Sequence, residues 1–266
     1  MKNSVSISIG GIPVKITLDD ELFLNEILEK YSNFIVDDID PTINLEIEVL
    51  EDESGHNILL EVPKLTLESE ELYKIFWNSF SGEFDIHSMK GKLRCRSQLD
   101  LNNYLRIIYS LVLLEEQGFL VHAASLIRNG IGYLFPGKSG TGKTTISRLS
   151  NDSILLSDEV SLVKKVDGEY NIFGTPFWGE LAIAGENTQA PLKSVFLPKK
   201  DQENYITPAK SVKTLEHLIP NVLFFLSDNE FNMQLFNICH DFVNVIPAYE
   251  LHFLPDPSFW SVINAK

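Results

Sequence analysis

The sequence has very few cysteines. There are two, Cys95 and Cys239, and they stand far apart with no C-x-x-C pair and no metal-ligand spacing. A secreted chain that depended on disulfides, or a zinc-binding module, would carry more of them at closer spacing. We therefore expect both cysteines to be free thiols in a reducing compartment.

Long apolar runs are also absent. The most apolar segment, residues 104–114, is interrupted by Arg106 and Ser110. It is shorter than the roughly 20 apolar residues that a membrane-spanning helix needs. The first residues, Met1 to Ser6, lack the apolar stretch of a signal peptide. These absences predict a cytoplasmic protein that does not insert into a membrane.

Positive charge is scarce. The chain has 22 Lys and Arg residues against 37 Asp and Glu residues, which gives a formal net charge of −15. So acidic a chain repels the phosphate backbone of nucleic acids and the surface of anionic membranes. We therefore expect no nucleic-acid partner and no membrane partner, while the oligomeric state stays open.

The 266 residues, 44% of them hydrophobic, suffice for one large domain or two smaller ones. Alternating apolar residues predict a β-rich region over residues 1–99, with an amphipathic helix over 22–31. The predicted strands are 5–9, 12–18, 43–49, 58–62, 82–87 and 92–97. A largely apolar helix should follow, with Asp100 as its N-cap and Gly118 just past its end. We place a domain boundary near residue 100, which gives domains 1–99 and 100–266.

The strongest motif is a glycine-rich stretch that fits G-x-x-x-x-G-K-[ST]. An apolar run, 131–135, precedes it, and residues 144–149 should begin a helix. In this context the backbone N–H groups of the loop converge on phosphate, and the helix dipole adds to the attraction. The alternative is a glycine-rich turn that matches by chance. The residues concerned are Gly137, Lys138, Ser139, Gly140, Thr141, Gly142, Lys143, Thr144 and Thr145.

The loop residues predict a nucleotide site. Lys143 should reach the terminal phosphates of a bound nucleotide, and the Thr144 hydroxyl should ligate Mg²⁺. The expected ligands are therefore ATP and Mg²⁺.

Two further features lie near this loop in the sequence. The apolar run 119–127, which predicts a buried strand, contains His122, and the short apolar strand 153–157 ends in Asp158 and Glu159. Mg²⁺ prefers oxygen ligands, and phosphoryl transfer needs a group that orients the attacking hydroxyl. The alternatives are a core histidine bonded to a backbone carbonyl and a pair of acids that are merely solvated.

The segment after these acids predicts a hairpin, 160–173, that turns at Asp167-Gly168. Residues 174–180 follow, rich in glycine and aromatic residues. We expect a substrate loop there, with Trp178 and Glu180 as acceptor-binding residues, or else a structural turn with its aromatic rings in the core.

The remaining segments predict further regular structure. We expect a helix over 211–219, a helix opened by a capping box at Ser227 and Glu230, a strand over 247–254 and a terminal helix over 258–263. The apolar runs 193–197 and 222–226 fit either a buried strand or a helix.

The glycine loop resembles the phosphate loops of HPr kinase/phosphorylase and of ATP-dependent phosphoenolpyruvate carboxykinase. His122 precedes Gly137 at the distance seen for a site histidine of HPr kinase, and Asp158-Glu159 stands where that family has two aspartates. The resemblance covers residues 119–180 and implies an α/β fold with a P-loop kinase core built on a mixed β-sheet. It implies that Asp158 is the base, that Glu159 and Thr144 hold Mg²⁺, and that His122 contacts phosphate or supports the site.

We therefore expect a kinase that transfers the γ-phosphate of ATP to a hydroxyl of a peptide, a protein serine or a small molecule. Asp158 and Glu159 are adjacent strand residues that point to opposite faces, so their roles as base and metal ligand can be exchanged. A nucleotide hydrolase without an acceptor and an ATP-binding regulator are the alternatives. The sequence does not identify the acceptor.

Overall fold

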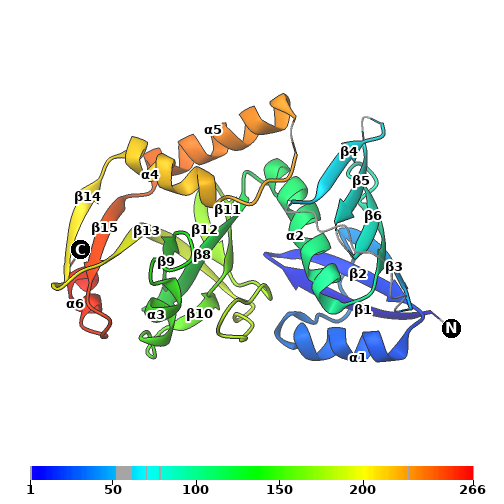
Figure 1. Cartoon of the computed structure of the whole chain (residues 1–266), viewed down its shortest axis with the longest axis horizontal. Coiled ribbons are helices and arrows are strands. Elements are labelled where there is room, and N and C mark those ends of the chain that lie inside the picture. Colours follow the sequence, from blue (N-terminus) through cyan, green and yellow to red (C-terminus); the bar gives the residue numbers. More distant parts are fainter. Residues whose placement is uncertain (1, 52–61, 70, 78, 227, 266) are drawn as a thin grey trace. The chain divides into compact units, whose positions relative to one another are not determined.

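The computed structural model describes residues 2–51, 62–69, 71–77, 79–226 and 228–265. The chain forms two compact units, Met1–Val112 with Phe224–Ser227, and Leu113–Leu223 with Asp228–Lys266. Both units combine helices with β-sheets of parallel and antiparallel strands, so the fold is of the α/β class with mixed sheets, as the sequence predicted (Figure 1). None of the described helices is long and apolar enough to cross a membrane.

The N-terminal unit contains a seven-stranded sheet. In spatial order its strands are β1 (Asn3–Ile9), β2 (Ile12–Leu18), β3 (Ile43–Val49), β7 (Lys90–Cys95), β6 (Phe80–Asp85), β5 (Leu72–Trp77) and β4 (Lys64–Leu67). The β1–β2 hairpin is confirmed, and Gly10 and Gly11 both have positive φ at its turn. The sequence did not predict β4 and β5, and most of the strand predicted at 58–62 lies outside the described residues.

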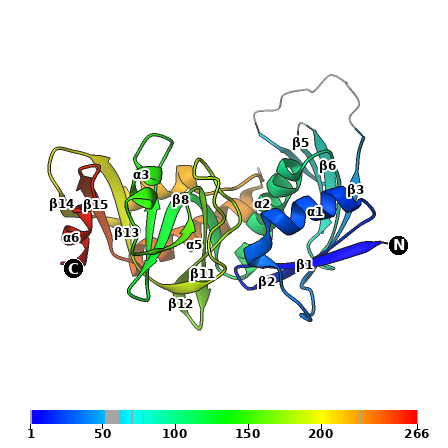
Figure 2. The same cartoon turned by 90° about the horizontal axis from the view of Figure 1, so that it is seen from below.

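Two helices, α1 (Glu21–Lys30) and α2 (Gln98–Glu115), complete this unit (Figure 2). The α2 helix is tied to two strands of the sheet. The Tyr109 hydroxyl donates to the carbonyl of Ile12 at 2.8 Å, and the Tyr104 hydroxyl donates to that of Glu83 at 2.6 Å. Most of α2 belongs to the N-terminal unit, which runs on to Val112.

The ends of α2 differ from those predicted. Asp100 is not the N-cap: it lies in the first turn, where its carboxylate accepts the backbone N–H groups of Arg96 and Ser97. Ser97 Oγ accepts the N–H of Asp100 in return, at 3.3 Å, which is the reciprocal pattern of a capping box. At the other end Gln117, with φ of 51°, takes the left-handed position, and Gly118 follows it and donates to the Leu113 carbonyl.

The C-terminal unit is built on an eight-stranded sheet. Its strands are β8 (Phe119–Arg128), β9 (Ile131–Pro136), β10 (Ile154–Ser157), β11 (Val160–Val166), β12 (Glu169–Phe173), β13 (Gln189–Lys200), β14 (Tyr205–Ala209) and β15 (Ala248–Phe253). β8 pairs with β11 and β9, β13 pairs with β12 and β9, and β11 pairs with β12, so these five strands close a ring. The predicted β11–β12 hairpin is confirmed, with positive φ at Asp167 and Gly168 as a type I′ turn requires.

The helices of this unit are α3 (Lys143–Arg148), α4 (Ser211–Leu218), α5 (Asn229–Val245) and α6 (Phe259–Asn264). The α5 helix has Asp228 as its N-cap, one residue after the predicted Ser227, because the Asp228 carboxylate accepts the N–H groups of Glu230 and Phe231. Residues 193–197 are part of the long strand β13. Residues 222–226 form neither a strand nor a helix, apart from one bridge between Val222 and Val121.

Three parallel strands set the position of the site. β13 pairs in parallel with β9 and with β15, so the carboxyl ends of β9, β13 and β15 meet at one edge of the sheet. The glycine loop follows β9 at that edge. In α/β folds, the carboxyl ends of parallel strands are where ligands commonly bind.

Glu250 on β15 accepts ion pairs from Lys199 on β13, at 2.6 Å, and from Lys213 on α4. Hydrogen bonds from Lys199 and then Lys213 lower the pKa of Glu250 from 4.5 to about 2. Because the folded pKa lies below the unfolded one, this stabilisation is complete above pH 4.5 and is lost as the pH falls toward 2. We expect Glu250→Gln to abolish that share of acid sensitivity, with a smaller loss of stability between pH 6 and pH 3 in urea titrations. An unchanged pH dependence would contradict this role.

Candidate functional site

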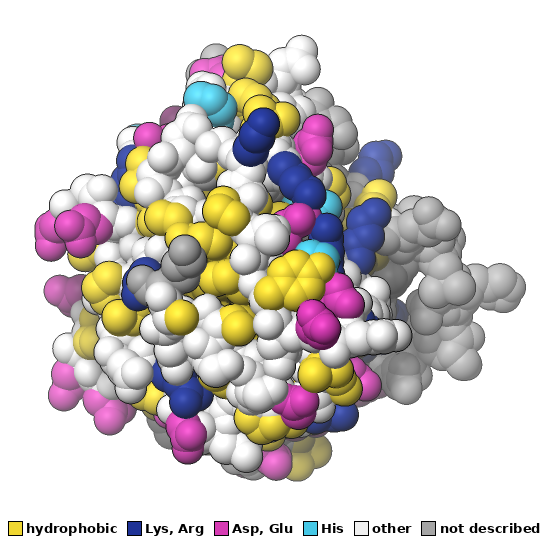
Figure 3. All heavy atoms as spheres, turned by 90° about the vertical axis from the view of Figure 1, so that its left-hand side faces the viewer, with side chains coloured by type: hydrophobic (Ala, Val, Ile, Leu, Met, Phe, Trp, Pro, Cys, Tyr) yellow, Lys and Arg dark blue, Asp and Glu magenta, His cyan; other side chains and the backbone are white. Residues whose placement is uncertain are grey.

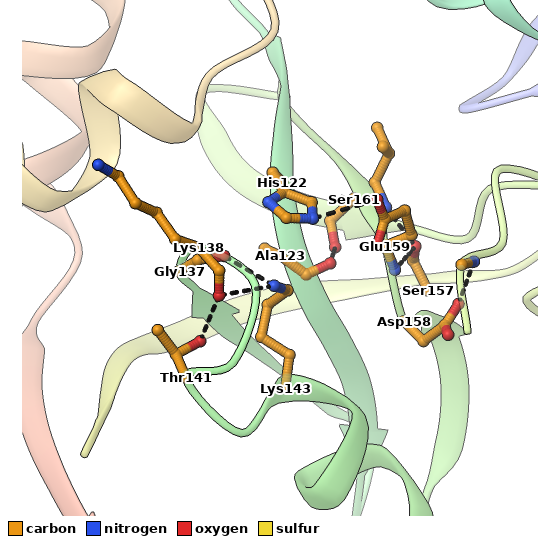
Figure 4. A network of polar contacts seen from close by, with 12 residues as sticks. His122, Ala123, Gly137, Lys138, Thr141, Lys143, Ser157, Asp158, Glu159 and Ser161 are labelled. Carbon is orange, nitrogen blue, oxygen red and sulfur yellow. Dashed lines mark hydrogen bonds and ion pairs between the residues drawn. The ribbon is translucent and has the colours of Figure 1, made fainter. Parts of the chain in front are cut away.

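The glycine loop joins β9 to α3 and wraps around the Lys143 ammonium. Lys143 is buried, and its Nζ donates to the carbonyls of Gly137 at 2.7 Å and of Lys138 at 3.2 Å (Figure 4). The Thr141 hydroxyl donates to the same Lys138 carbonyl at 2.9 Å. The strand, loop and helix order predicted from the sequence is therefore present.

Two glycines allow this loop to sit so close to its surroundings. A Cβ at Gly137 would lie 2.6 Å from Thr141 Oγ1, and a Cβ at Gly142 would lie 2.5 Å from the Phe253 ring. Gly142 also has a φ of 107°, a backbone conformation that other residues rarely adopt. The ring of the core residue Phe253, at the end of β15, therefore packs against Gly142 and limits where the loop can lie.

His122 lies beside the loop, where the sequence placed it. The antiparallel pairing of β8 with β9 brings the Gly137 N–H to within 3.3 Å of the His122 carbonyl. The imidazole Nε2 lies 3.1 Å from Glu159 Oε1, and both side chains remain partly exposed. The ring thus contacts a carboxylate, and its chemical role stays a prediction.

Asp158 and Glu159 connect β10 to β11, and both of these strands pair with β8. Ser157 is opposite Ser125, Val160 is opposite His122, and the Ala123 N–H donates to the Glu159 carbonyl at 3.0 Å. The register shifts between Leu155 and Ser157, where one residue is inserted. Such irregularities redirect side chains next to functional sites.

The two carboxylates have different surroundings. Asp158 is only 2% exposed, and its two oxygens accept the N–H groups of Gly179 and Leu181, each at 2.9 Å. Glu159 is partly exposed and faces His122 (Figure 4). Asp158 therefore anchors the segment that contains Gly179 and Leu181. Glu159 is the carboxylate that contacts His122 next to the glycine loop.

The segment held by Asp158 lies over this junction. Thr175 donates its N–H to the Leu156 carbonyl at 3.0 Å, and Glu186 donates to Leu155 at 2.9 Å. Phe177 is fully buried, as the structural alternative required, whereas Trp178 is half-buried and Glu180 is exposed. A Cβ at Gly179 would lie 2.7 Å from Glu159 Oε2, so Trp178 and Glu180 flank the point where the segment meets Glu159.

The electrostatics of Lys143 suit an anionic ligand. Burial lowers the pKa of Lys143, while Glu159 and then Asp158 act in the opposite direction. An anion bound at the loop would add a favourable charge next to this desolvated ammonium and would raise its pKa.

The chain matches the model of one protein family over residues 90–265, about two thirds of its length. That family is described as SynChlorMet cassette protein ScmC. The chain belongs to the ScmC family. The matched region includes the glycine loop, His122 and Asp158-Glu159. No curated protein matches the chain.

This assignment corrects the resemblance seen in the sequence. The expected membership of the HPr kinase/phosphorylase and phosphoenolpyruvate carboxykinase group is wrong, because the ScmC family is a different one. The resemblance rested on the glycine loop and two short neighbouring features. Short loops of this kind recur on unrelated chains, because their geometry follows from backbone chemistry.

The residues available for a metal ion in this ScmC-family chain are Thr144, in the first turn of α3, and the carboxylates at 158 and 159. Over the described parts of the chain, no three His, Cys, Asp or Glu side chains group as a metal site. Mg²⁺ that arrives with a nucleotide needs only one or two carboxylates, since phosphate oxygens and water complete its shell. Glu159 is the partly exposed carboxylate of the two, and Thr144 offers a hydroxyl oxygen in the first turn of α3.

Two hollows, of about 850 and 560 Å³, lie on the open face of the N-terminal sheet and contain none of the predicted site residues. Their charged walls are largely paired. Arg94 contacts Glu48 at 3.0 Å, and Lys92 lies 3.4 Å from Glu83. We assign the site to the glycine loop, because its geometry and its buried lysine point to a ligand and these paired surface charges do not.

A pair of glycine variants tests how Phe253 fixes the loop. Gly140 has a φ of 84° with nothing within 4 Å of an added Cβ, whereas Gly142 meets the Phe253 ring. Gly140→Ala should cost about 1 kcal/mol of unfolding free energy for its left-handed backbone. Gly142→Ala should cost about 1–3 kcal/mol more, from the clash. Urea titrations measure both, and equal losses would show that the contact with Phe253 does not constrain the loop.

Proposed function

We propose that this chain is a phosphotransferase that binds ATP with Mg²⁺ at the glycine loop and transfers the terminal phosphate to a hydroxyl of a peptide, a protein serine or a small molecule. In this proposal β8, β9, β10 and α3 form a P-loop kinase core. The observation that carries it is the His122–Glu159 pair, placed by β8 beside the loop that surrounds Lys143. Nucleotide binding alone would need no such pair.

The loop residues act on the triphosphate. Lys143 exchanges its two carbonyl partners, Gly137 and Lys138, for phosphate oxygens, and backbone N–H groups of the loop donate to the same anion. Thr144 and Glu159 would hold Mg²⁺, which when bound neutralises charge on the transferring phosphate.

The His122–Glu159 pair acts on the acceptor. The acceptor hydroxyl oxygen forms the new bond to phosphorus, the bond from that phosphorus to the ADP oxygen breaks, and the hydroxyl proton moves to the His122 imidazole. Phosphoryl transfer depends on in-line placement more than on a strong base, so the main task of the pair is to orient the hydroxyl.

Asp158 has a different role from the one that the sequence suggested. Its two oxygens hold the N–H groups of Gly179 and Leu181, so it positions the segment that carries Trp178 and Glu180. We assign that segment to the acceptor. Of the two assignments left open by the sequence, this proposal adopts the one with Glu159 near the phosphates, which the amide contacts of Asp158 support.

Removing the Lys143 charge tests the nucleotide site. A charge-assisted contact contributes roughly 1.5–3 kcal/mol, so Lys143→Ala should weaken MgATP binding by about tenfold or more. Isothermal titration measures this, with Lys193→Ala, an exposed lysine on β13, as the control. Wild-type MgATP affinity in Lys143→Ala would refute nucleotide binding at the loop.

Matched amide variants of the two acids test the division of roles. Glu159→Gln should raise the Mg²⁺ concentration needed for MgATP binding and for turnover, because it retains size but loses the carboxylate charge that holds the metal. Asp158→Asn turns one acceptor oxygen into a donor that faces a backbone N–H. It should therefore raise KM for the acceptor more than it lowers kcat.

The acceptor for these assays would come from a radiolabel transfer screen against peptides and metabolites. Because the family is described as a cassette protein, other products of the same cassette are the first acceptors to test. Equal kinetic losses in both acid variants would contradict the assigned roles. ATP hydrolysis that no acceptor stimulates would favour a nucleotide hydrolase.

A further inference from the structure

The glycine loop divides the carboxyl edge of the sheet into two sides. Successive strand pairings run in the order β10, β8, β9, β13, β15 and β14. His122 and Glu159 lie on the β8–β10 side of the loop. A nucleotide with its terminal phosphate toward them must extend its nucleoside half over β13, β15 and β14.

An exposed aromatic stack occupies that other side. The rings of Tyr205 on β14 and His252 on β15 lie parallel, with centroids 4.2 Å apart and planes at 10°. Tyr205 is 39% exposed although one face of its ring is covered by the imidazole. On this side of the molecule, basic side chains and histidine are interspersed with acidic side chains (Figure 3).

Hydrogen bonds of Asp201 connect the stack to the strand that contacts the glycine loop. Asp201 Oδ2 lies 2.7 Å from His252 Nδ1 and accepts a hydrogen bond from the Tyr205 hydroxyl at 3.2 Å. The backbone N–H of Asp201 donates to the carbonyl of Phe253, the residue whose ring contacts Gly142. Asp201 therefore connects the Tyr205–His252 stack to Phe253, whose ring contacts the glycine loop.

The spacing suits a nucleotide. Tyr205 stands three strands from β9, which is about 14 Å at the usual separation of neighbouring strands. An extended nucleoside triphosphate, from its terminal phosphate to its base, spans such a distance. Lys138 leaves the loop on the side away from Glu159, where it can meet the α-phosphate (Figure 4).

We infer that the Tyr205–His252 stack is the platform on which the purine base of the nucleotide lies, with its face against the exposed face of the Tyr205 ring. This inference rests on the proposed function, because it needs phosphate at the glycine loop. Aromatic rings bind bases by stacking and accept different bases, since every base has a π-face. The platform therefore accommodates both ATP and GTP.

Comparison of ATP with inorganic tripolyphosphate tests the platform, because tripolyphosphate has the phosphates and no base. Tyr205→Ala should weaken MgATP binding by about tenfold, the usual effect of losing one base-stacking ring, and leave tripolyphosphate binding unchanged. Tyr205→Phe keeps the ring and should retain wild-type affinity for both ligands.

The matched control is Phe236→Ala. Phe236 on α5 is also exposed and also stacks on a histidine, His240, at 6.2 Å and 17°, but it lies outside this edge of the sheet. It should bind both ligands as the wild type does. Lys143→Ala should lose both ligands, and wild-type affinity of that variant would refute the phosphate site itself.

Two results would overturn the platform while leaving the phosphate site intact. One is unchanged MgATP affinity in Tyr205→Ala. The other is an equal loss of ATP and tripolyphosphate in Tyr205→Ala, which would mean that the stack merely supports the loop.

Discussion

The backbone pairing of β8 is the constraint on which the site depends. This strand pairs with β9, β10 and β11, and the residues that it brings together come from three separate stretches of the chain. Its hydrogen bonds place the Gly137 N–H at the His122 carbonyl and the Ala123 N–H at the Glu159 carbonyl. Ladder hydrogen bonds are short and directional, so the relative positions of loop, imidazole and carboxylate follow from strand register.

Beneath this strand, buried hydroxyl groups hold the register. Ser161 Oγ is fully buried, donates to the Ala123 carbonyl at 3.0 Å and is hydrogen-bonded to the Ser125 hydroxyl at 2.8 Å, and so joins β11 to β8 near the site. A buried hydroxyl without partners is costly, so these bonds favour one register over its neighbours. The same register turns Asp158 inward to the 174–188 segment and Glu159 outward to His122.

The sequence predicted the elements that carry local signals. The β1–β2 and β11–β12 hairpins have glycine turns, and the glycine loop has a motif with the right flanks, so each could be predicted within its own segment. Helix ends shifted by one to three residues because several polar residues compete for a cap, as Ser97 and Asp100 do at α2. Strand β4 alternates over only four residues and β5 lacks a strict alternation of apolar and polar residues, so neither could be predicted from its pattern.

The parts of the site that depend on long-range contacts could not be predicted. Nothing in the local sequence indicates that Asp158 binds amides some twenty residues away, at Gly179 and Leu181. The Tyr205–His252 stack likewise joins two strands through the antiparallel register of β14 with β15. Short motifs could not identify the family either. A glycine loop of this type requires a certain backbone geometry, and that geometry occurs in unrelated families.

The net charge of −15 sets a further condition on how this chain could hold a triphosphate. Two lysines beside β15, Lys199 and Lys213, do not supply free positive charge, because both are paired with Glu250. The attraction for a triphosphate must therefore come from the loop itself, through its amides and Lys143. Salt screens this attraction beyond about 10 Å. Under the proposed function, acidic surroundings oppose nonspecific phosphate ligands, and the shape of the loop and the proposed base platform select the anion that binds.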